Sequence, residues 1–407
     1  MENKLRILQI AHPNVPILAK SGGYGGLEEV VEVLDRRYAQ MGHKSFVVAS
    51  SDSDVSGTLL PTIPSLYGPG RGHMKADVDH ISRGFTEHAR KTWEHIKEVQ
   101  PDVIHDHTGY HRERSVSERL FDTSKGLRTA KEIEAGGIPP VLITLHGYLN
   151  EENREMYEGF EELFRDQGVH FSAVSQFQRA AFRGTVDVDS VVLNAIDVDS
   201  YEYGGEGAGY VFSMGSIYRG KGTHVAIDTA LKLGKKLILA GPYFHNAKYW
   251  EERLRPKVDR VELGVPADQL RDLAREFVES DDNVLYVGEL GAREKRKLYT
   301  GADAFYFPVT IDETFGLVSA EANASGVPVV SYLSGGVPEV VKNGVSGFTV
   351  RRGDEQQFIR AASRAGELSR QDCRAWAEEN FRVERQASDY MGVYRDMCQN
   401  SNGRGQG

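Results

Sequence analysis

The chain contains few cysteines and no long hydrophobic run. Only Cys373 and Cys398 occur among 407 residues, so neither a disulfide-stapled fold nor a zinc site built from cysteine ligands is expected. No apolar stretch approaches the roughly 20 residues that a helix needs to cross a bilayer. The first residues lead into a short strand-like run and not into the core of a signal peptide. We therefore expect a cytoplasmic protein without integral membrane association.

An excess of basic charge is also missing. The chain has 49 Lys and Arg against 59 Asp and Glu, which gives a formal net charge of −10. This balance weighs against a large contact with nucleic-acid phosphates, whereas a small anionic ligand needs only a few local donors. Hydrophobic residues make up 40% and charged residues 27%, which is typical of a globular protein. We expect a small-molecule ligand and no nucleic-acid partner.

Short apolar runs alternate with amphipathic stretches, a pattern typical of α/β domains with parallel sheets. The glycine-dense stretch 203–209 separates two such series, so we predict a first domain over 1–203 and a second over 204–375. The segment 371–397 reads as one closing helix, of which 376–398 joins the first domain. The expected strands are Leu5–Ala11, Lys44–Ala49, Val103–His105, Val141–Leu145 and Val191–Leu193, then Tyr210–Met214, Lys236–Ala240, Asn283–Val287, Ala304–Pro308 and Pro328–Tyr332.

A first glycine loop, residues 21–26, lies between the first strand and the helix that follows it. Its glycines, including Gly23 and Gly25, would let the backbone approach a ligand closely. Glu28 stands where a dinucleotide-binding fingerprint ends in glycine, so a nicotinamide-type site is not supported. The alternative is a turn that binds nothing.

A second glycine loop, residues 215–223, follows a predicted strand and opens a helix. It carries Arg219 and Lys221, and a cationic loop at a helix N-terminus favours a phosphate. The loop fits G-x-x-x-x-G-K, but Gly222 replaces the Ser or Thr that holds magnesium in a P-loop. A P-loop-like nucleotide hydrolase and a loop with merely solvated charges are the alternatives.

Two glutamates, Glu313 and Glu321, flank seven residues after another predicted strand. If most of this segment is helical, they lie about 12 Å apart along one side of a helix, which we expect over Leu317–Ala324. Carboxylates suit sugar hydroxyls because they only accept hydrogen bonds, and the amides near 314–317 would form a helix N-terminus that can face phosphates. The alternative is an amphipathic helix with two exposed glutamates.

Histidines end two predicted strands of the first half. His146 follows the strand Val141–Leu145 and is expected to face a ligand, the alternative being a structural histidine. His105 and His107 share one face of their strand, with Asp106 between them. No further motif supports a metal site there, so we expect hydrogen-bonding roles and assign no metal.

Seven motifs occur in a fixed order along nearly the whole chain: the glycine loop 22–26, Pro101-Asp102-Val103-Ile104-His105, Leu145-His146-Gly147, Asn194-Ala195-Ile196-Asp197, Gly220-Lys221-Gly222, the segment Glu313–Glu321 and Gly335-Gly336-Val337-Pro338-Glu339. Together they resemble the retaining glycosyltransferases of the GT-B fold, family 4. The resemblance implies two facing Rossmann-like doubly wound domains, an interdomain cleft and a C-terminal crossover helix. It also implies transfer of a hexose-type sugar from a nucleotide-diphosphate donor, with a UDP-sugar favoured, to a hydroxyl of a carbohydrate, lipid or small-molecule acceptor, without a metal or cofactor.

The resemblance also implies residue roles. Glu313, His146 and Lys221 would be catalytic: Glu313 would contact the donor hexose, His146 would orient it, and Lys221 would neutralise the diphosphate. Glu321 would hold the ribose. Ser216 stands where the family has an arginine, and Arg219 would reach the same phosphate from the loop. This departure keeps a non-catalytic sugar-nucleotide-binding protein as an alternative. The remaining donor-binding residues that the resemblance implies are Gly23, Gly25, Gly288, Glu289, Thr314, Phe315, Gly316 and Leu317.

Overall fold

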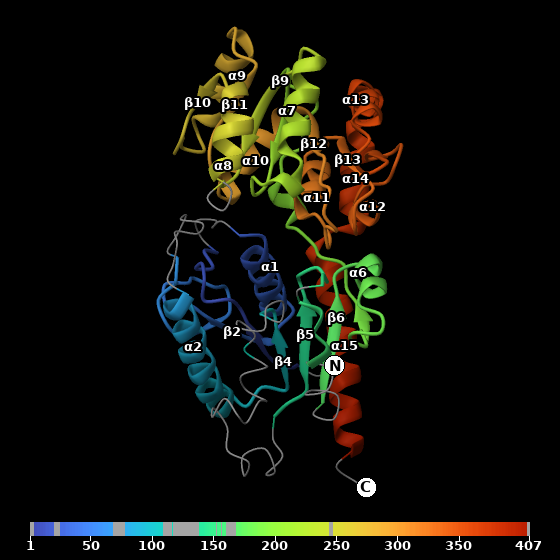
Figure 1. Ribbon diagram of the computed structural model, residues 1–407. Coiled ribbons are helices and arrows are strands. Elements are labelled where there is room, and N and C mark those ends of the chain that lie inside the picture. The colour runs from blue at the N-terminus through green and yellow to red at the C-terminus, as the bar shows by residue number, and fades with distance from the viewer. Residues whose placement is uncertain are drawn as a thin grey trace. The chain divides into compact units, whose positions relative to one another are not determined.

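The computed structural model describes residues 4–19, 25–67, 78–108, 116, 138–151, 153–155, 157–159, 168–243 and 247–404 (Figure 1). The chain divides into two compact units, one formed by residues 1–194 and 383–407 and the other by residues 195–382. Of the first glycine loop, Gly23 lies outside the described residues and Gly25 within them. None of the described helices has the length and hydrophobicity needed to cross a membrane.

The described strands of the first unit form a parallel seven-stranded sheet in the order β3-β2-β1-β4-β5-β6-β7. Strands β4 and β5 are buried along their whole length, as expected for a sheet covered on both faces. The chain order reverses beside β1, which pairs with both β2 and β4. The strands are β1 Arg6–Ile10, β2 Lys44–Ala49, β3 Thr58–Pro61, β4 Val103–Asp106, β5 Val141–Leu145, β6 Val169–Ala173 and β7 Ser190–Val191. The described helices are α1 Gly26–Gln40, α2 Val78–Val99, α6 Gln176–Ala181 and α15 Val383–Arg404.

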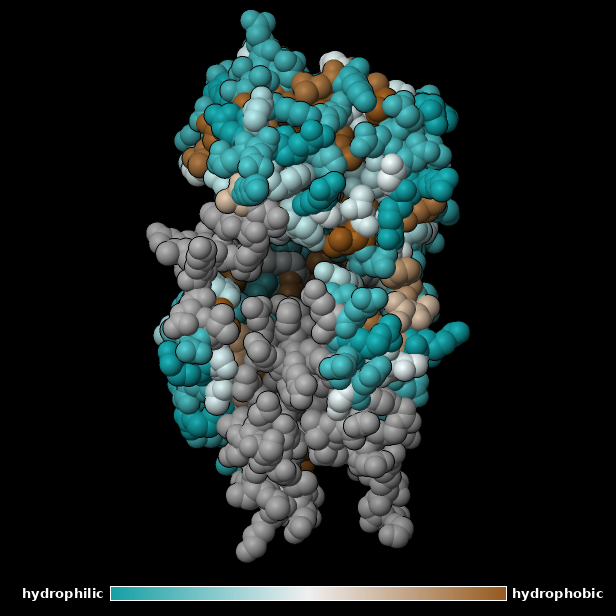
Figure 2. All heavy atoms as spheres, viewed as in Figure 1, coloured by the Kyte–Doolittle hydropathy of each residue, from teal (hydrophilic) through white to brown (hydrophobic). Residues whose placement is uncertain are grey.

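The described strands of the second unit form another parallel seven-stranded sheet, in the order β10-β11-β9-β8-β12-β13-β14. They are β8 Tyr210–Met214, β9 Lys236–Ala240, β10 Arg260–Val261, β11 Val284–Tyr286, β12 Ala302–Phe307, β13 Val329–Tyr332 and β14 Gly347–Val350. The α-helices are α7 Thr223–Lys232, α8 Ala247–Tyr249, α9 Leu270–Glu279, α10 Ala292–Gly301, α11 Leu317–Ala324, α12 Val337–Val340, α13 Glu355–Arg364 and α14 Arg370–Asn380. Shorter turns of helix are η3 Val198–Ser200, η4 Arg219–Lys221, η6 Trp250–Leu254, η7 Arg255–Lys257 and η8 Ala365–Glu367. On the face drawn in Figure 2, the surface of this unit is mainly hydrophilic, with hydrophobic residues in small groups.

The prediction of one helix over 371–397 is wrong, because the helix is interrupted between α14 and α15. Phe381 leaves the helical conformation, and its carbonyl accepts a hydrogen bond of 2.9 Å from the amide of Ile196. Arg382 forms an isolated parallel bridge with the same residue. The backbone at this point pairs with another segment, and α14 and α15 belong to different units.

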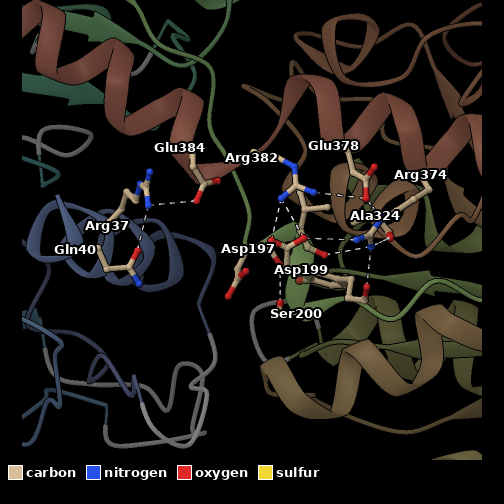
Figure 3. Close-up of polar contacts among 12 residues, drawn as sticks. Arg37, Gln40, Asp197, Asp199, Ser200, Ala324, Arg374, Glu378, Arg382 and Glu384 are labelled. Atoms are coloured by element: carbon tan, nitrogen blue, oxygen red, sulfur yellow. Dashed lines mark hydrogen bonds and ion pairs between the residues drawn. The ribbon is translucent and has the colours of Figure 1, made fainter.

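Arginines of α14 and its end hold the segment after residue 194 in the second unit (Figure 3). Arg374 donates a hydrogen bond of 2.7 Å to the carbonyl of Tyr201, and Arg382 contacts both carboxylate oxygens of Asp199 at 3.0 and 2.9 Å. The compact units therefore divide at 194/195 and 382/383, whereas the sequence analysis places these boundaries at 203/204 and 375/376.

In the first unit, α15 buries aromatic side chains and contacts α1. The hydroxyl of Tyr394 lies 3.1 Å from that of Tyr38 in α1 and 2.7 Å from Nδ1 of His105 in β4. The hydroxyl of Tyr390 lies 3.2 Å from Oγ1 of Thr144 in β5. A buried polar network thus fastens the last helix to the sheet.

Candidate functional site

Three loops of the second unit follow β8, β12 and β13, which are neighbouring parallel strands. The loops therefore start from the same edge of the sheet, where ligands bind in doubly wound domains. The loop after β8 carries Lys221, and the loop after β12 carries Glu313. The third loop contributes Gly335 and Gly336 ahead of α12.

The structure brings Lys221 and Glu313 into direct contact. The ammonium Nζ of Lys221 donates a hydrogen bond to Oε2 of Glu313 and lies 5.5 Å from the ring centre of Phe307. The two side chains are 20% and 16% exposed, so the charges are largely shielded from water but can still be reached by a ligand. An ammonium has three donors, so it can keep the carboxylate and accept a second anionic partner.

Backbone contacts fix the loop that carries Lys221. Gly222 has a φ of 72°, and a Cβ atom there would lie 1.9 Å from the carbonyl oxygen of Pro308. The amide of Thr310 donates to the carbonyl of Gly220 at 2.8 Å. A Ser or Thr at position 222, which a P-loop requires, has no room here. The geometry therefore does not support the hydrolase alternative.

The backbone of Glu313 is held with equal closeness. The amide of Gly336 donates to the carbonyl of Glu313 at 2.7 Å. Gly335 has a φ of 60°, and a Cβ atom there would lie 2.1 Å from the same carbonyl oxygen. Only glycine allows this approach, so the Gly-Gly pair positions the backbone from which the carboxylate projects.

The predicted helix Leu317–Ala324 is confirmed as α11, but Glu313 lies before its start, so the two glutamates do not lie along one side of a single helix. Gly316 has a φ of 93° and a ψ of 58°, and this left-handed conformation breaks the path of a helix. Glu321 therefore lies on α11, whereas Glu313 lies in the loop before it. Within the described part of the chain, the amides of Phe315, Gly316 and Leu317 make no hydrogen bond.

Glu321 is not a surface residue. Its side chain is 2% exposed, and Oε1 accepts a hydrogen bond of 2.6 Å from Nζ of Lys295 in α10. Among the described residues, no group forms a hydrogen bond with Oε2. The alternative of two exposed glutamates is therefore excluded. Lys295 is missing from the predicted site, although its position between Ala292 and Leu298 on the apolar face of α10 is a signal that could have revealed it.

The other predicted donor-binding residues of this unit lie in loops after strands. Ser216 is partly buried in the loop after β8, and Arg219 is exposed in η4. Gly288 follows β11, and its carbonyl accepts from the amide of Gly241 at 2.7 Å. Gly241 in turn approaches the carbonyl oxygen of Gly215 so closely that a Cβ atom would lie 1.9 Å away. Glu289 is partly buried next to Gly288.

In the first unit, His146 is partly buried at the end of β5, and its Nε2 lies 3.1 Å from Nδ1 of His107. Burial lowers the pKa of His146 to about 3, which keeps the ring neutral at pH 7. His105 uses both ring nitrogens in contacts of 2.7 Å with Tyr394 and Thr144. The part of the chain that is described holds no group of three or more His, Cys, Asp or Glu that could bind a metal.

Gly25 forms the N-cap of α1 with a φ of 130°. A Cβ atom at this position would lie 2.0 Å from Oε2 of Glu28, so the carboxyl folds back over the glycine. Burial, followed by repulsion from Glu29, raises the pKa of Glu28 to about 7. The first glycine loop is thus followed by a carboxyl group whose charged form is disfavoured by burial.

Two family descriptions match the two halves of the chain. "Glycosyltransferase Family 4" matches residues 24–200, and "Glycosyl transferases group 1" matches residues 204–382. Curated relatives include two proteins named D-inositol 3-phosphate glycosyltransferase. The one from Stackebrandtia nassauensis is 30% identical over 158 residues, 36% of this chain, and that match spans only 35% of the relative's length. The one from Mycolicibacterium smegmatis is 24% identical over 81% of this chain and 76% of the relative.

Solved structures extend the likeness to the whole fold. The structure of HepE from Anabaena in complex with UDP and glucose superposes with a TM-score of 0.64 at 18% identity, covering 96% of this chain and all of that one. At this identity the likeness concerns the fold alone. Two parallel-sheet units of seven described strands each, matched over nearly their full length, confirm the predicted GT-B architecture. With both halves matched by their family descriptions, the chain belongs to the family 4 glycosyltransferases of the GT-B fold.

Proposed function

We propose that this protein transfers a hexose-type sugar from a nucleotide-diphosphate donor to an acceptor hydroxyl, with retention at the anomeric carbon and without a metal ion. The observation that carries the proposal is the contact between Lys221 and Glu313. On the helix α11 that follows Glu313, Oε2 of Glu321 is buried and has no hydrogen-bond partner among the described residues. A cation for a diphosphate and two carboxylates for sugar hydroxyls then lie in one unit.

The chemistry needs stabilisation of charge on the leaving group. The bond between the anomeric carbon and the diphosphate oxygen breaks, and the acceptor oxygen forms the new bond to that carbon. The acceptor's proton passes to the departing phosphate. Lys221 and the amides of Phe315 to Leu317, which are unused within the described part of the chain, would stabilise the developing negative charge. Glu313 would accept a hydrogen bond from a donor-sugar hydroxyl.

The comparisons also suggest which donor base and which acceptors to test first. The Anabaena structure contains UDP and glucose, which supports a UDP-sugar as the first donor to test. The names of the two curated relatives make D-inositol 3-phosphate one arm of an acceptor panel. Carbohydrate and lipid acceptors form the other arms.

The test is a thermal-shift panel of UDP-, GDP-, ADP- and TDP-sugars, followed by transfer assays with and without EDTA. We expect one nucleotide class to raise the melting temperature, EDTA to leave transfer unchanged, and NMR of the product to show the donor's anomeric configuration. Inversion would overturn the retaining mechanism, and loss of transfer with EDTA would overturn metal independence.

Glu313→Gln separates an enzyme from a protein that only binds the donor. The substitution keeps the shape but removes the negative charge, so we expect transfer to fall by at least about 100-fold while the affinity for the free nucleoside diphosphate stays within about twofold. Glu355→Gln, at an exposed position in the first turn of α13, is the matched control. A chain that binds nucleotide sugars but shows no turnover before substitution would favour the binding protein.

A further inference from the structure

The ion pair between Lys295 and Glu321 is almost closed to solvent. The side chains are 7% and 2% exposed, and Nζ lies 2.6 Å from Oε1. Removing two charges from water is costly, and a well-packed apolar pair of the same volume is often at least as stable. Packing alone therefore does not explain why two charged groups occupy this position.

The helix that carries Lys295 makes its position more unusual. Ala292, Lys295, Leu298 and Tyr299 are the buried residues of α10, so the lysine lies on the apolar face of the helix. In an amphipathic helix, lysines normally lie on the opposite, solvent-exposed face. The side chain of this lysine is buried, and its ammonium donates a hydrogen bond to the carboxylate of Glu321 on α11.

Within the described part of the chain, only one of the two carboxylate oxygens of Glu321 has a hydrogen-bond partner. Oε1 of Glu321 accepts from Lys295, whereas Oε2 is buried and has no hydrogen-bond partner among the described residues. A buried oxygen without a partner loses its hydration and gains nothing in return. Such an atom, four residues after the start of α11 and its unused amides, indicates that a ligand hydroxyl completes the site.

We propose that Lys295 is a positioning residue: it holds the carboxylate of Glu321 in one orientation, so that Oε2 accepts a hydrogen bond from one hydroxyl of the donor's ribose. This inference rests on the proposed function, because it requires a nucleotide donor. The ribose contact of Glu321 is the one that the family resemblance implies, and the inference adds Lys295, which acts through Glu321 and not on the sugar.

The test compares the tightest binder among UDP, GDP and ADP with its 2′-deoxy and 3′-deoxy forms by calorimetry. For the unaltered chain, we expect the weaker deoxy form to bind about tenfold less tightly, because one hydrogen bond to a charged acceptor is lost. We call the factor by which the weaker deoxy form binds less tightly than the normal nucleotide the deoxy ratio. In Lys295→Met this ratio should fall to about twofold or less, because Oε2 is no longer held in place. Lys295→Arg should restore at least half of the ratio on a logarithmic scale.

The ratio separates positioning from a general loss of stability, since a partly unfolded sample lowers both affinities equally. Lys297→Met, two residues along the same helix and in contact with Glu202 at 3.7 Å, is the matched control and should leave the ratio unchanged. Should Lys295→Met fail to fold, Lys295→Gln keeps a polar side chain that is one bond shorter and uncharged, so it should hold Glu321 less firmly and reduce the ratio to below about threefold.

The outcomes are distinct. A ratio in Lys295→Met or Lys295→Gln equal to that of the unaltered chain would overturn this inference while leaving the proposed function intact. No binding of any of the three nucleoside diphosphates to the unaltered chain would overturn the proposed function and the inference with it.

Discussion

Lys221 and Glu313 form one hydrogen bond across 92 positions of sequence. Each charge compensates the cost of burying the other. Because the two charges have opposite signs, their substitutions have different effects on an anionic ligand. Without Lys221, the site keeps a shielded carboxylate and becomes repulsive to a diphosphate. Without the charge of Glu313, the ammonium still attracts the diphosphate, whereas the donor-sugar hydroxyl loses its charged acceptor.

Lys221→Ala should weaken the binding of the best nucleoside diphosphate by about 10- to 100-fold, because a hydrogen bond between charged groups contributes about 1.5–3 kcal/mol. Isothermal titration calorimetry measures this change. Lys232→Ala, an exposed lysine in the last turn of α7, is the control and should bind like the unaltered chain. Equal affinity in both variants would remove Lys221 from the donor site.

Gly222→Ser tests whether the second glycine loop can become a P-loop. The serine would meet the carbonyl oxygen of Pro308 in a left-handed conformation, so we expect a loss of stability of about 2–4 kcal/mol and no magnesium-dependent hydrolysis of a nucleoside triphosphate. Denaturant unfolding measures the stability.

Gly234→Ser is the control that separates the steric clash at position 222 from the cost of a left-handed backbone conformation. Gly234 has a φ of 60°, but a Cβ atom there would meet nothing within 4 Å, so its substitution reports the conformational cost alone. We expect about 1 kcal/mol for this variant. If the two variants lose the same stability, the contact with Pro308 is not what excludes a side chain at position 222.

At the scale of elements, α2 docks on the first sheet through a buried histidine. Nε2 of His88 donates to the carbonyl of Ala11 at 3.0 Å, and Nδ1 lies 2.6 Å from Oγ1 of Thr62. Burial lowers the pKa of His88 from 6.5 to about 4. Between about pH 6.5 and pH 4, the His88 ring therefore stays neutral in the folded state, whereas the same ring takes up a proton in the unfolded chain.

The sign of the pH dependence follows from this difference. Between about pH 6.5 and 4 the unfolded state binds more protons at this site, so the free energy of unfolding falls as the pH falls, by up to about 1.4 kcal/mol per unit. We expect His88→Gln to be less stable than the unaltered chain at pH 7, with a gap that narrows toward pH 4.5. His95→Gln, on the same helix and partly exposed, is the control. A constant gap in urea unfolding across this range would contradict the assignment.

The sequence predicted elements well where the apolar pattern is continuous. The predicted bounds of Tyr210–Met214, Lys236–Ala240 and Leu317–Ala324 coincide with β8, β9 and α11. The strands β3, β6, β10 and β14 were not predicted. The edge strands Thr58–Pro61, Arg260–Val261 and Gly347–Val350 are short and partly exposed, and in the interior strand Val169–Ala173 the polar residues His170 and Ser172 interrupt the apolar pattern. The break at Phe381 carries no glycine or proline and depends on a distant segment.

The site shows the same division. Lys221 and Glu313 stand beside glycines after predicted strands, a local pattern that sequence reasoning can detect. Their mutual contact, and the pair of Lys295 with Glu321, depend on which strands and helices become neighbours. Those contacts follow from the folded arrangement, and no motif or fixed residue spacing in the sequence predicts them.

At the scale of the molecule, the chain leaves the first unit at residue 194 and returns to it at Val383. Truncation after Arg382 removes α15, whose tyrosines contact Tyr38, His105 and Thr144. We expect the first unit to lose its protection from hydrogen exchange in β4 and β5, because buried hydroxyl and imidazole partners are exposed, while β8 and β12 stay protected.

Hydrogen exchange followed by mass spectrometry measures both units in one sample. Truncation after Arg404 is the control, because it leaves α15 in place. Equal exchange in β4 and β5 before and after removal of α15 would show that the first sheet does not depend on the returning helix.

The close approach of Gly335 to Glu313 has a consequence for how this protein can diverge. A substitution at Glu313 changes the chemistry of the side chain, whereas any side chain at position 335 must move the backbone that bears the carboxylate. In a saturation-mutagenesis library selected for activity, a residue that performs no chemistry would then be as invariant as the acid it supports. Such a library would therefore report the steric room around the carboxylate as well as its chemistry.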